Sequence, residues 1–317
     1  MINNQYQYSV IEKQKNSKKF KIKYDYFLKK INDTLSALVT EKDSPENTIY
    51  RAMNYSLMAG GKRLRPVLLL AVSEMLGINL DQVMPYACAL EMIHTYSLIH
   101  DDLPAMDNDD YRRGILTNHK VFGDATAILA GDALLNYAFE YMLECVIDKS
   151  RKRSYSLEAG VKAISYIAKA AGVKGMIGGQ IVDIESEGKE ITCEQLEYIH
   201  KHKTGALIKA SVMVPAILAL LDEEKKKVLE KYSSNIGLAF QVKDDILDAE
   251  GDFKLLGKST GKDARIGKST FVSFYGIEDS REILYKLIRE AVDSLQIFEE
   301  KAFFLKELAI YIAERKN

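Results

Sequence analysis

The sequence predicts an all-α fold, a bundle of packed helices. Long stretches of the 317 residues carry apolar side chains at helical spacing, and only five residues are proline. The segment 284–298 shows the pattern clearly, because its apolar residues recur three or four positions apart. Segments 135–142 and 163–171 repeat the pattern. Alternating runs joined by Asn-Gly or Asp-Gly turns, which indicate β-hairpins, do not occur.

Composition favours one globular domain. Apolar residues make up 47% of the chain and charged residues 28%, which is enough to bury a sizeable core. No internal repeat, low-complexity tract or interdomain linker is visible. The first residues are polar and rich in lysine. We therefore expect residues 1–24 to form a loosely ordered extension and residues 25–317 to form a single domain.

Charge and hydropathy exclude several classes of partner. The formal net charge of −1 gives no reason to expect a nucleic acid or an anionic membrane. The longest apolar run, 212–221, is too short to cross a bilayer. No secretory signal precedes the first helix. Three widely spaced cysteines show neither metal-ligand spacing nor a disulfide framework. These features predict a soluble protein of the cytoplasm.

A first acidic cluster follows an apolar helix predicted at 87–99. It contains Asp101, Asp102 and Asp107. On a regular helix Asp101 and Asp107 would lie about 240° apart. Pro104 should end or deform the helix, because proline lacks an amide hydrogen and restrains the residue before it. A break at Pro104 is what could bring Asp107 back beside Asp101.

A second acidic cluster, Asp244, Asp245 and Asp248, follows the apolar segment 236–242. Asp244 and Asp248 are four residues apart and share one face of a helix. Both clusters thus lie near the C-terminal ends of buried helices, where the helix dipole disfavours carboxylates unless a cation is bound. Oxygen ligands without histidine or cysteine favour magnesium, which commonly bridges carboxylates to substrate phosphates. The pair of clusters favours one divided magnesium site over two solvated acidic turns.

Cations that could complete a diphosphate site occur in several loops. The segment 60–66, Gly-Gly-Lys-Arg-Leu-Arg-Pro, combines two glycines with three cations. Arg112 and Arg113 follow the first cluster, where they could also simply balance nearby acidic residues. Lys203, Lys258 and Lys268 stand in three further motifs. The last two do not form P-loops, since the glycine spacing is one residue too long and no strand precedes them.

With these motifs the chain resembles the trans-prenyl diphosphate synthases, and the bacterial farnesyl diphosphate synthases most closely. The resemblance runs from about residue 25 to the C-terminus. Its motifs stand in the expected order at 60–66, 91–114, 179–183, 200–206 and 240–248. It implies the isoprenoid synthase fold, in which antiparallel helices surround a deep central cavity, and it implies a homodimer.

The resemblance also implies roles for individual residues and three magnesium ions per site. Two ions would be held by Asp101, Asp102 and Asp107, and the third by Asp244, supported by Asp245 and Asp248. The allylic diphosphate would be gripped by Arg112, Lys203, Thr204, Gln241 and Lys258. The diphosphate of isopentenyl diphosphate would be held by Lys62, Arg65, His94 and Arg113. Lys268 is a further expected substrate-binding residue.

Product length is expected to depend on Tyr96 and Ser97, which precede Asp101 by five and four residues. They lie roughly 6–7.5 Å down the helix axis. In the family this position forms the floor under the growing chain, and a large aromatic side chain there resembles enzymes that stop at fifteen carbons. An ordinary core tyrosine fits the same geometry.

Three alternative functions share parts of this pattern. A geranylgeranyl diphosphate synthase has nearly every motif and differs mainly near Tyr96. A class I terpene cyclase needs no clamp for a second diphosphate, so Lys62, Arg65 and Arg113 argue against it. A non-catalytic partner subunit would be expected to lose aspartates from one cluster, and none is missing. The sequence therefore predicts a magnesium-dependent prenyltransferase of the farnesyl diphosphate synthase type.

Overall fold

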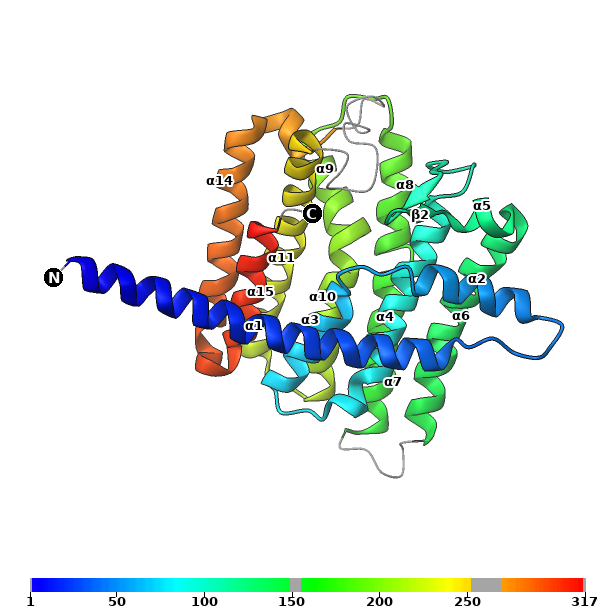
Figure 1. Cartoon of the computed structure of the whole chain (residues 1–317), viewed down its shortest axis with the longest axis horizontal. Coiled ribbons are helices and arrows are strands. Elements are labelled where there is room, and N and C mark those ends of the chain that lie inside the picture. Colours follow the sequence, from blue (N-terminus) through cyan, green and yellow to red (C-terminus); the bar gives the residue numbers. More distant parts are fainter. Residues whose placement is uncertain (1, 149–154, 252–268, 316–317) are drawn as a thin grey trace.

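The computed structural model describes residues 2–148, 155–251 and 269–315, and these form a helical bundle (Figure 1). The N-terminal half contains α1 (Ile2–Leu38), α2 (Asn47–Leu57), α3 (Leu64–Met75), α4 (Leu80–Asp101), β1 (Tyr111–Arg112), β2 (Ile115–Leu116), α5 (Asn118–Phe122) and α6 (Asp124–Asp148). The C-terminal half contains α7 (Leu157–Ala171), α8 (Met176–Ser186), α9 (Cys193–Ile199), η2 (His200–Thr204), α10 (Gly205–Leu218), α11 (Glu223–Glu250), α14 (Phe271–Ser294), η3 (Leu295–Ala302) and α15 (Phe303–Glu314). The predicted all-α fold is confirmed.

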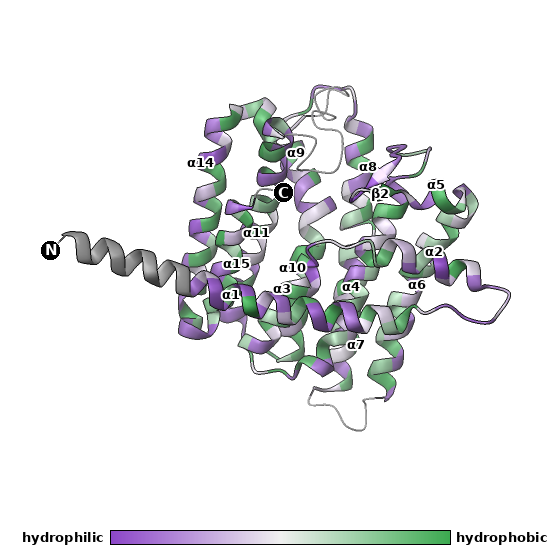
Figure 2. Ribbon diagram, viewed as in Figure 1, coloured by the Kyte–Doolittle hydropathy of each residue, from purple (hydrophilic) through white to green (hydrophobic). Residues whose placement is uncertain are grey.

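The helices at the centre of the bundle are those with the most uniformly apolar sequences. In α3 every residue except Glu74 is buried, and α10 is buried over most of its length. A helix that is apolar on all sides must be surrounded by others. Figure 2 shows that most of the other helices carry hydrophobic and hydrophilic residues in turn along their length. None of the helices in the described residues is both long and apolar enough to cross a membrane.

The N-terminal segment is more ordered than its composition predicts. Residues 1–24 were expected to be a loosely ordered extension, yet α1 begins at Ile2, and its first turns project beyond the bundle (Figure 1). Phe20 and Tyr24 are buried, and the Phe20 ring lies 4.9 Å from Phe304 of α15 between centroids. The aromatic residues at helical spacing in this lysine-rich segment were the signal for this packing.

The described residues also include one small two-stranded sheet, which the turn patterns did not predict. β1 and β2 pair in antiparallel register, with Arg112 opposite Ile115. The turn residues Arg113 and Gly114 both have positive φ, 54° and 80°. This is the backbone required by a type I′ hairpin, which an Arg-Gly pair signals less strongly than Asn-Gly does. The hairpin fixes the positions of both arginines.

Candidate active site

The first acidic cluster surrounds the end of α4. The helix ends at Asp101, and the chain turns through Pro104 so that the Asp107 amide donates to the Asp101 carbonyl oxygen at 2.8 Å. The Asn108 amide donates to the carbonyl of Leu103 at 3.1 Å. The predicted break is confirmed, and it places Asp107 beside Asp101.

The carboxylate of Asp101 lies in a partly dehydrated position. Burial raises its pKa to about 6, and the positive charge of Lys203 offsets this only in part. A carboxyl group whose charge is disfavoured in this way is a suitable place for a bound cation. Lys203 on η2 is therefore close enough to act electrostatically on Asp101 at the end of α4.

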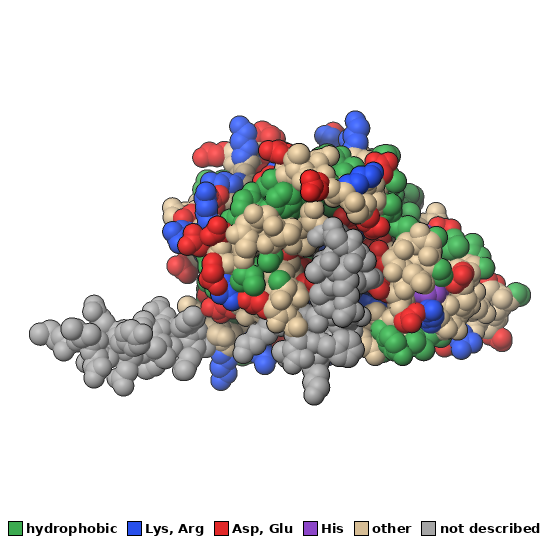
Figure 3. Space-filling view, turned by 90° about the horizontal axis from the view of Figure 1, so that it is seen from above, with side chains coloured by type: hydrophobic (Ala, Val, Ile, Leu, Met, Phe, Trp, Pro, Cys, Tyr) green, Lys and Arg blue, Asp and Glu red, His purple; other side chains and the backbone are tan. Residues whose placement is uncertain are grey.

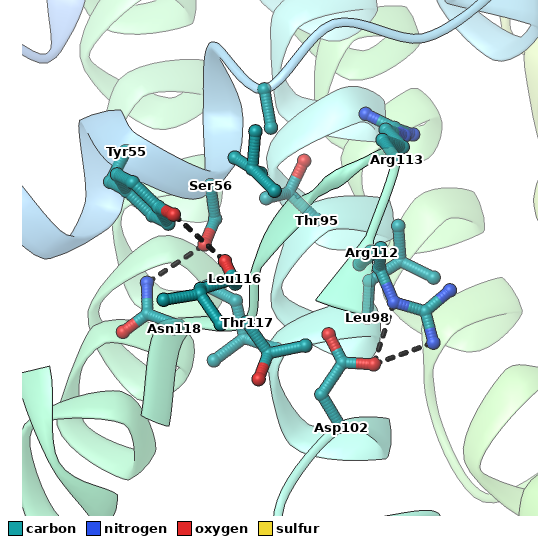
Figure 4. Close-up of a pocket in the computed structure, with 13 residues that line it drawn as sticks. Tyr55, Ser56, Thr95, Leu98, Asp102, Arg112, Arg113, Leu116, Thr117 and Asn118 are labelled. Carbon is teal, nitrogen blue, oxygen red and sulfur yellow. Dashed lines mark hydrogen bonds and ion pairs between the residues drawn. The ribbon is translucent and has the colours of Figure 1, made fainter. Parts of the chain in front are cut away.

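Arg112 binds the second aspartate of the cluster. Its Nε and Nη2 atoms each lie 2.6 Å from Oδ1 of Asp102, as Figure 4 shows. A weaker contact of 3.7 Å joins Nη2 to Asp109. Burial raises the pKa of Asp102 even with this partner. In this structure Arg112 therefore neutralises Asp102, so Asp101 and Asp107 are the stronger candidates for metal binding in this cluster.

Lys203 is held in place by a carboxylate and by a rare backbone conformation. Its Nζ lies 2.7 Å from Oδ2 of Asp183 on α8. Residues 200–204 form a π-helix, η2, a feature that often marks functional sites. Gly179 packs directly on it, since a Cβ there would lie 2.2 Å from the Lys203 amide nitrogen. No role was predicted for Asp183, although it ends the motif 179–183.

Substituting Gly179 tests this packing. Because Gly179→Ala places a methyl group against backbone rather than against a flexible side chain, α8 and η2 must separate. Overpacking of this kind costs about 1–3 kcal/mol, so the melting temperature should fall. Glu185→Ala, an exposed change on the same helix, should change stability by less than about 0.5 kcal/mol. Equal melting temperatures for wild type and Gly179→Ala would contradict the close contact.

Gln241 and Thr204 connect η2 to the second acidic cluster. The Thr204 hydroxyl lies 3.1 Å from Oε1 of Gln241, whose Nε2 donates to Oδ1 of Asp245 at 3.1 Å. The other oxygen of Asp245 accepts from the Phe271 amide at 2.8 Å. Asp245 is buried, and both of its oxygens are engaged. It therefore supports the arrangement of α11 and α14 and presents no open oxygen to a metal here.

Asp244 presents its carboxylate on the other side of α11. Its Oδ1 lies 2.8 Å from Nη2 of Arg315, the residue that follows α15, and the two form an ion pair. Asp248 lies one turn further along α11. Arg315 was not predicted, because a basic residue near the end of a sequence carries no motif. The side chain of Asp244 is still 40% exposed, so it remains accessible to a ligand.

Four cationic or imidazole side chains gather near the hairpin. They are Lys62, Arg65, His94 and Arg113, and the charge of Arg113 acts on each of the other three. The Arg113 guanidinium donates to the Gly60 carbonyl and packs against Gly61, where a Cβ would lie 2.6 Å from its Cζ. Gly61 has φ of +116°, a conformation that other residues rarely adopt. The two glycines thus allow Arg113 to lie against the backbone.

The charges in this group are held together at an electrostatic cost. Burial, with Arg315 and Arg113 nearby, lowers the pKa of Lys62 to about 8. Burial also lowers the pKa of Arg65 to about 10. The pKa of His94 is lowered by burial and, in addition, by the nearby charges of Arg65 and Arg113. The Nε of Arg65 is buried without a hydrogen-bond partner among the described residues. An anion bound here would satisfy that donor and relieve the repulsion.

Arg63 differs from its neighbours because it is a structural residue. Its Nη1 lies 2.8 Å from Oε1 of Glu91 in a pair whose side chains are 1% and 2% exposed. It also donates to the Leu57 carbonyl and to Asn32. The motif 60–66 therefore sends Arg63 into the core, whereas the buried Nε of Arg65 has no hydrogen-bond partner among the described residues.

The donor set fits magnesium, although within the described ranges no three acidic, histidine or cysteine side chains converge on one point. Magnesium usually uses one or two carboxylates and completes its shell with water and substrate phosphates. Asp101, Asp107 and Asp244 offer hard oxygens of this kind. Figure 3 shows acidic side chains on the face of the molecule that is seen from above.

Tyr96 and Ser97 lie below the first cluster on α4. The Tyr96 ring is 6% exposed and meets His100 edge-on, with 5.7 Å between ring centroids. Its hydroxyl is buried with no hydrogen-bond partner in the described part of the chain, and burial raises its pKa to about 12. Ser97 donates to the His94 carbonyl at 2.9 Å. Lys258 and Lys268, the remaining predicted site residues, lie outside the described residues.

The family model described as polyprenyl synthetase matches residues 46–302. Farnesyl diphosphate synthase from Micrococcus luteus is 46% identical over 92% of this chain and 96% of its own. Geranylgeranyl diphosphate synthase from Cyanophora paradoxa is 46% identical over 90% and 93%. The crystal structure of an FPP/GFPP synthase from Zymomonas mobilis superposes with a TM-score of 0.83 at 34% identity, covering 93% of this chain and 99% of that one.

Proposed function

The chain belongs to the polyprenyl synthetase family and is a prenyltransferase, and we propose that its product is the fifteen-carbon (2E,6E)-farnesyl diphosphate. It would join isopentenyl diphosphate to dimethylallyl diphosphate and then to geranyl diphosphate. Relatives are named as farnesyl and as geranylgeranyl diphosphate synthases, so the family alone leaves the product open.

The observation that carries the fifteen-carbon proposal is the position of Tyr96. Its ring is buried five residues before Asp101, on the helix that ends at the first acidic cluster. A chain growing from a diphosphate bound at Asp101 would extend along α4 and meet this ring. The polar hydroxyl has no hydrogen bond among the described residues, so the side chain acts there by its bulk.

The residues of the site support an ionisation mechanism. Magnesium ions bound by Asp101, Asp107 and Asp244 would draw electron density from the allylic diphosphate. Lys203, oriented by Asp183, is placed to donate to the same group as the carbon–oxygen bond breaks. The allylic carbon becomes a carbocation and the diphosphate leaves with the bonding electrons. The apolar side chains of the central helices keep water from this cation.

A second group of residues holds the other substrate. Lys62, Arg65 and Arg113 would bind the diphosphate of isopentenyl diphosphate and so place its double bond beside the carbocation. The double bond attacks, a new carbon–carbon bond forms, and a proton leaves the adjacent carbon. The released diphosphate would take up this proton. The presence of this second clamp favours a synthase over a terpene cyclase.

The product proposal is tested by replacing the ring. Tyr96→Ala should open space below the fifteen-carbon chain, so that twenty-carbon and longer diphosphates form. Products made from dimethylallyl and isopentenyl diphosphates with magnesium would be sized by chromatography after dephosphorylation. Tyr96→Phe keeps the bulk and should still give fifteen carbons. A wild-type product of twenty carbons would instead favour the geranylgeranyl alternative, and an unchanged product from Tyr96→Ala would exclude Tyr96 as the floor.

We further propose that the enzyme is a homodimer, joined through α6, α7 and α8. Each of these helices presents exposed apolar residues within about a 100°-wide face. They are Ile128, Leu129, Leu143, Ile147, Leu157, Val161, Ile177, Ile181 and Ile184. Exposed apolar side chains in such numbers are typical of a protein interface.

Light scattering after gel filtration tests the dimer. Wild type should have twice the mass of one chain, and the double variant Leu129→Glu, Ile147→Glu should be monomeric. Ile22→Glu, at an exposed apolar residue on α1, is the matched control and should remain dimeric. A monomeric wild type would exclude the proposal.

We also propose that the protein is located in the cytoplasm. The free thiols of Cys88, Cys145 and Cys193 support this, because cysteines stay reduced in that compartment.

A further inference from the structure

Arg315 has a position that the mechanism above does not use. It follows α15, yet its side chain is only 3% exposed and reaches the end of α11. Its guanidinium carbon lies 4.1 Å from the centroid of the Phe240 ring. Its Nη2 donates to the Phe240 carbonyl oxygen at 2.9 Å. Stacking and hydrogen bonding thus fix the guanidinium in one place.

The same nitrogen binds Asp244. The distance from Nη2 to Oδ1 is 2.8 Å, while the Nε of Arg315 is buried without a partner among the described residues. A guanidinium removed from water is costly unless a carboxylate balances it. Asp244 is therefore the counter-ion of Arg315 in this structure. A metal ion at Asp244 would have to approach a fixed positive charge.

We propose that Arg315 is a competing cation, which keeps a divalent metal from Asp244 until a diphosphate enters the site. The inference rests on the proposed role of Asp244 as a metal ligand. Without substrate, Arg315 neutralises Asp244, and a divalent ion there would be repelled by the guanidinium. A bound diphosphate brings several negative charges and compensates both the metal and Arg315. Arg315 is thus a positioning residue, which makes the metal ion at Asp244 bind with or after the diphosphate and not before it.

This arrangement also links the two substrate sites. Lys62 lies within electrostatic reach of both Arg315 and Asp244. A metal ion at Asp244 would leave Arg315 bonded to the Phe240 carbonyl, with Lys62 still under the influence of its charge. The last metal ion would therefore bind together with the substrate. The allylic diphosphate would then ionise only after all the metal ions are in place.

Manganese binding to the complete protein tests the order. Free Mn²⁺ would be measured by electron paramagnetic resonance, with and without inorganic diphosphate and with correction for Mn²⁺–diphosphate complexes. Wild type should gain a metal site when diphosphate is added. Arg315→Gln should bind Mn²⁺ roughly tenfold more tightly at this site without diphosphate. Arg315→Lys, which keeps the charge, should behave more like wild type.

Matched variants separate the possible failures. Arg289→Gln, at an exposed arginine on α14, should leave binding unchanged. In the Asp244→Asn background, Arg315→Gln should have no further effect, because its action passes through Asp244. The inference is overturned if wild type binds all its Mn²⁺ without diphosphate, or if Arg315→Gln binds it equally or more weakly. If Asp244→Asn leaves Mn²⁺ binding unchanged even with diphosphate, the metal role of Asp244 fails instead.

Discussion

Replacing Asp101 with asparagine is expected to lower turnover roughly a hundred- to a thousandfold without unfolding the protein. Asparagine has the same shape but lacks the charge that a magnesium ion requires. Asp101 is the clearest choice in its cluster, because Asp102 is already bound by Arg112. Turnover would be measured with radiolabelled isopentenyl diphosphate at saturating magnesium.

Stability distinguishes loss of metal binding from loss of structure. Burial disfavours the charged form of Asp101, so the neutral asparagine should keep or raise the melting temperature of the metal-free protein. Asp279→Asn, an exposed change on α14, should keep full turnover. Near-normal turnover of Asp101→Asn would remove Asp101 from the mechanism.

The second large effect is expected at Arg65. Arg65→Met should raise KM for isopentenyl diphosphate roughly ten- to a hundredfold, because a buried charge-assisted hydrogen bond to the diphosphate is lost. KM for the allylic diphosphate should change little. The melting temperature should not fall, since the Nε of Arg65 has no partner among the described residues and its charge opposes that of Arg113.

Arg63 provides a matched control two positions away. Arg63→Met breaks the buried pair with Glu91, which should cost roughly 3–5 kcal/mol of stability. The two arginine variants are thus expected to fail in different assays, one in substrate binding and the other in thermal unfolding. An equal loss of stability in both would mean that Arg65 is also structural.

Features that depend on nearby residues could be predicted from the sequence. Pro104 ends the regular part of α4 as the chemistry of proline requires, and this predicted the return of Asp107 to Asp101. The apolar composition of the central helices likewise predicted the helical class. The metal and substrate roles that the family resemblance gives to the site residues remain predictions.

Features that depend on distant residues could not be predicted. From the sequence, Arg112 could either bind a ligand or balance the charge of nearby acidic residues. The structure shows that the hairpin places Arg112 against Asp102. Asp245 resembles its neighbours in sequence, yet its oxygens are taken by Gln241 and by the Phe271 amide. The pairing of Asp244 with Arg315 joins residues more than sixty positions apart in the chain, and no local pattern signals such a contact.

The packing of α1 against α15 affects how the protein should be engineered. Phe20 and Tyr24 stack on Phe304 and Tyr311, so the first helix supports the segment that carries Arg315 into the site. An affinity tag is therefore best placed at the amino terminus, where the first turns of α1 project away from the bundle. A tag fused after residue 317 would follow Arg315 by only two residues in the chain, and it is expected to lower turnover where an amino-terminal tag does not.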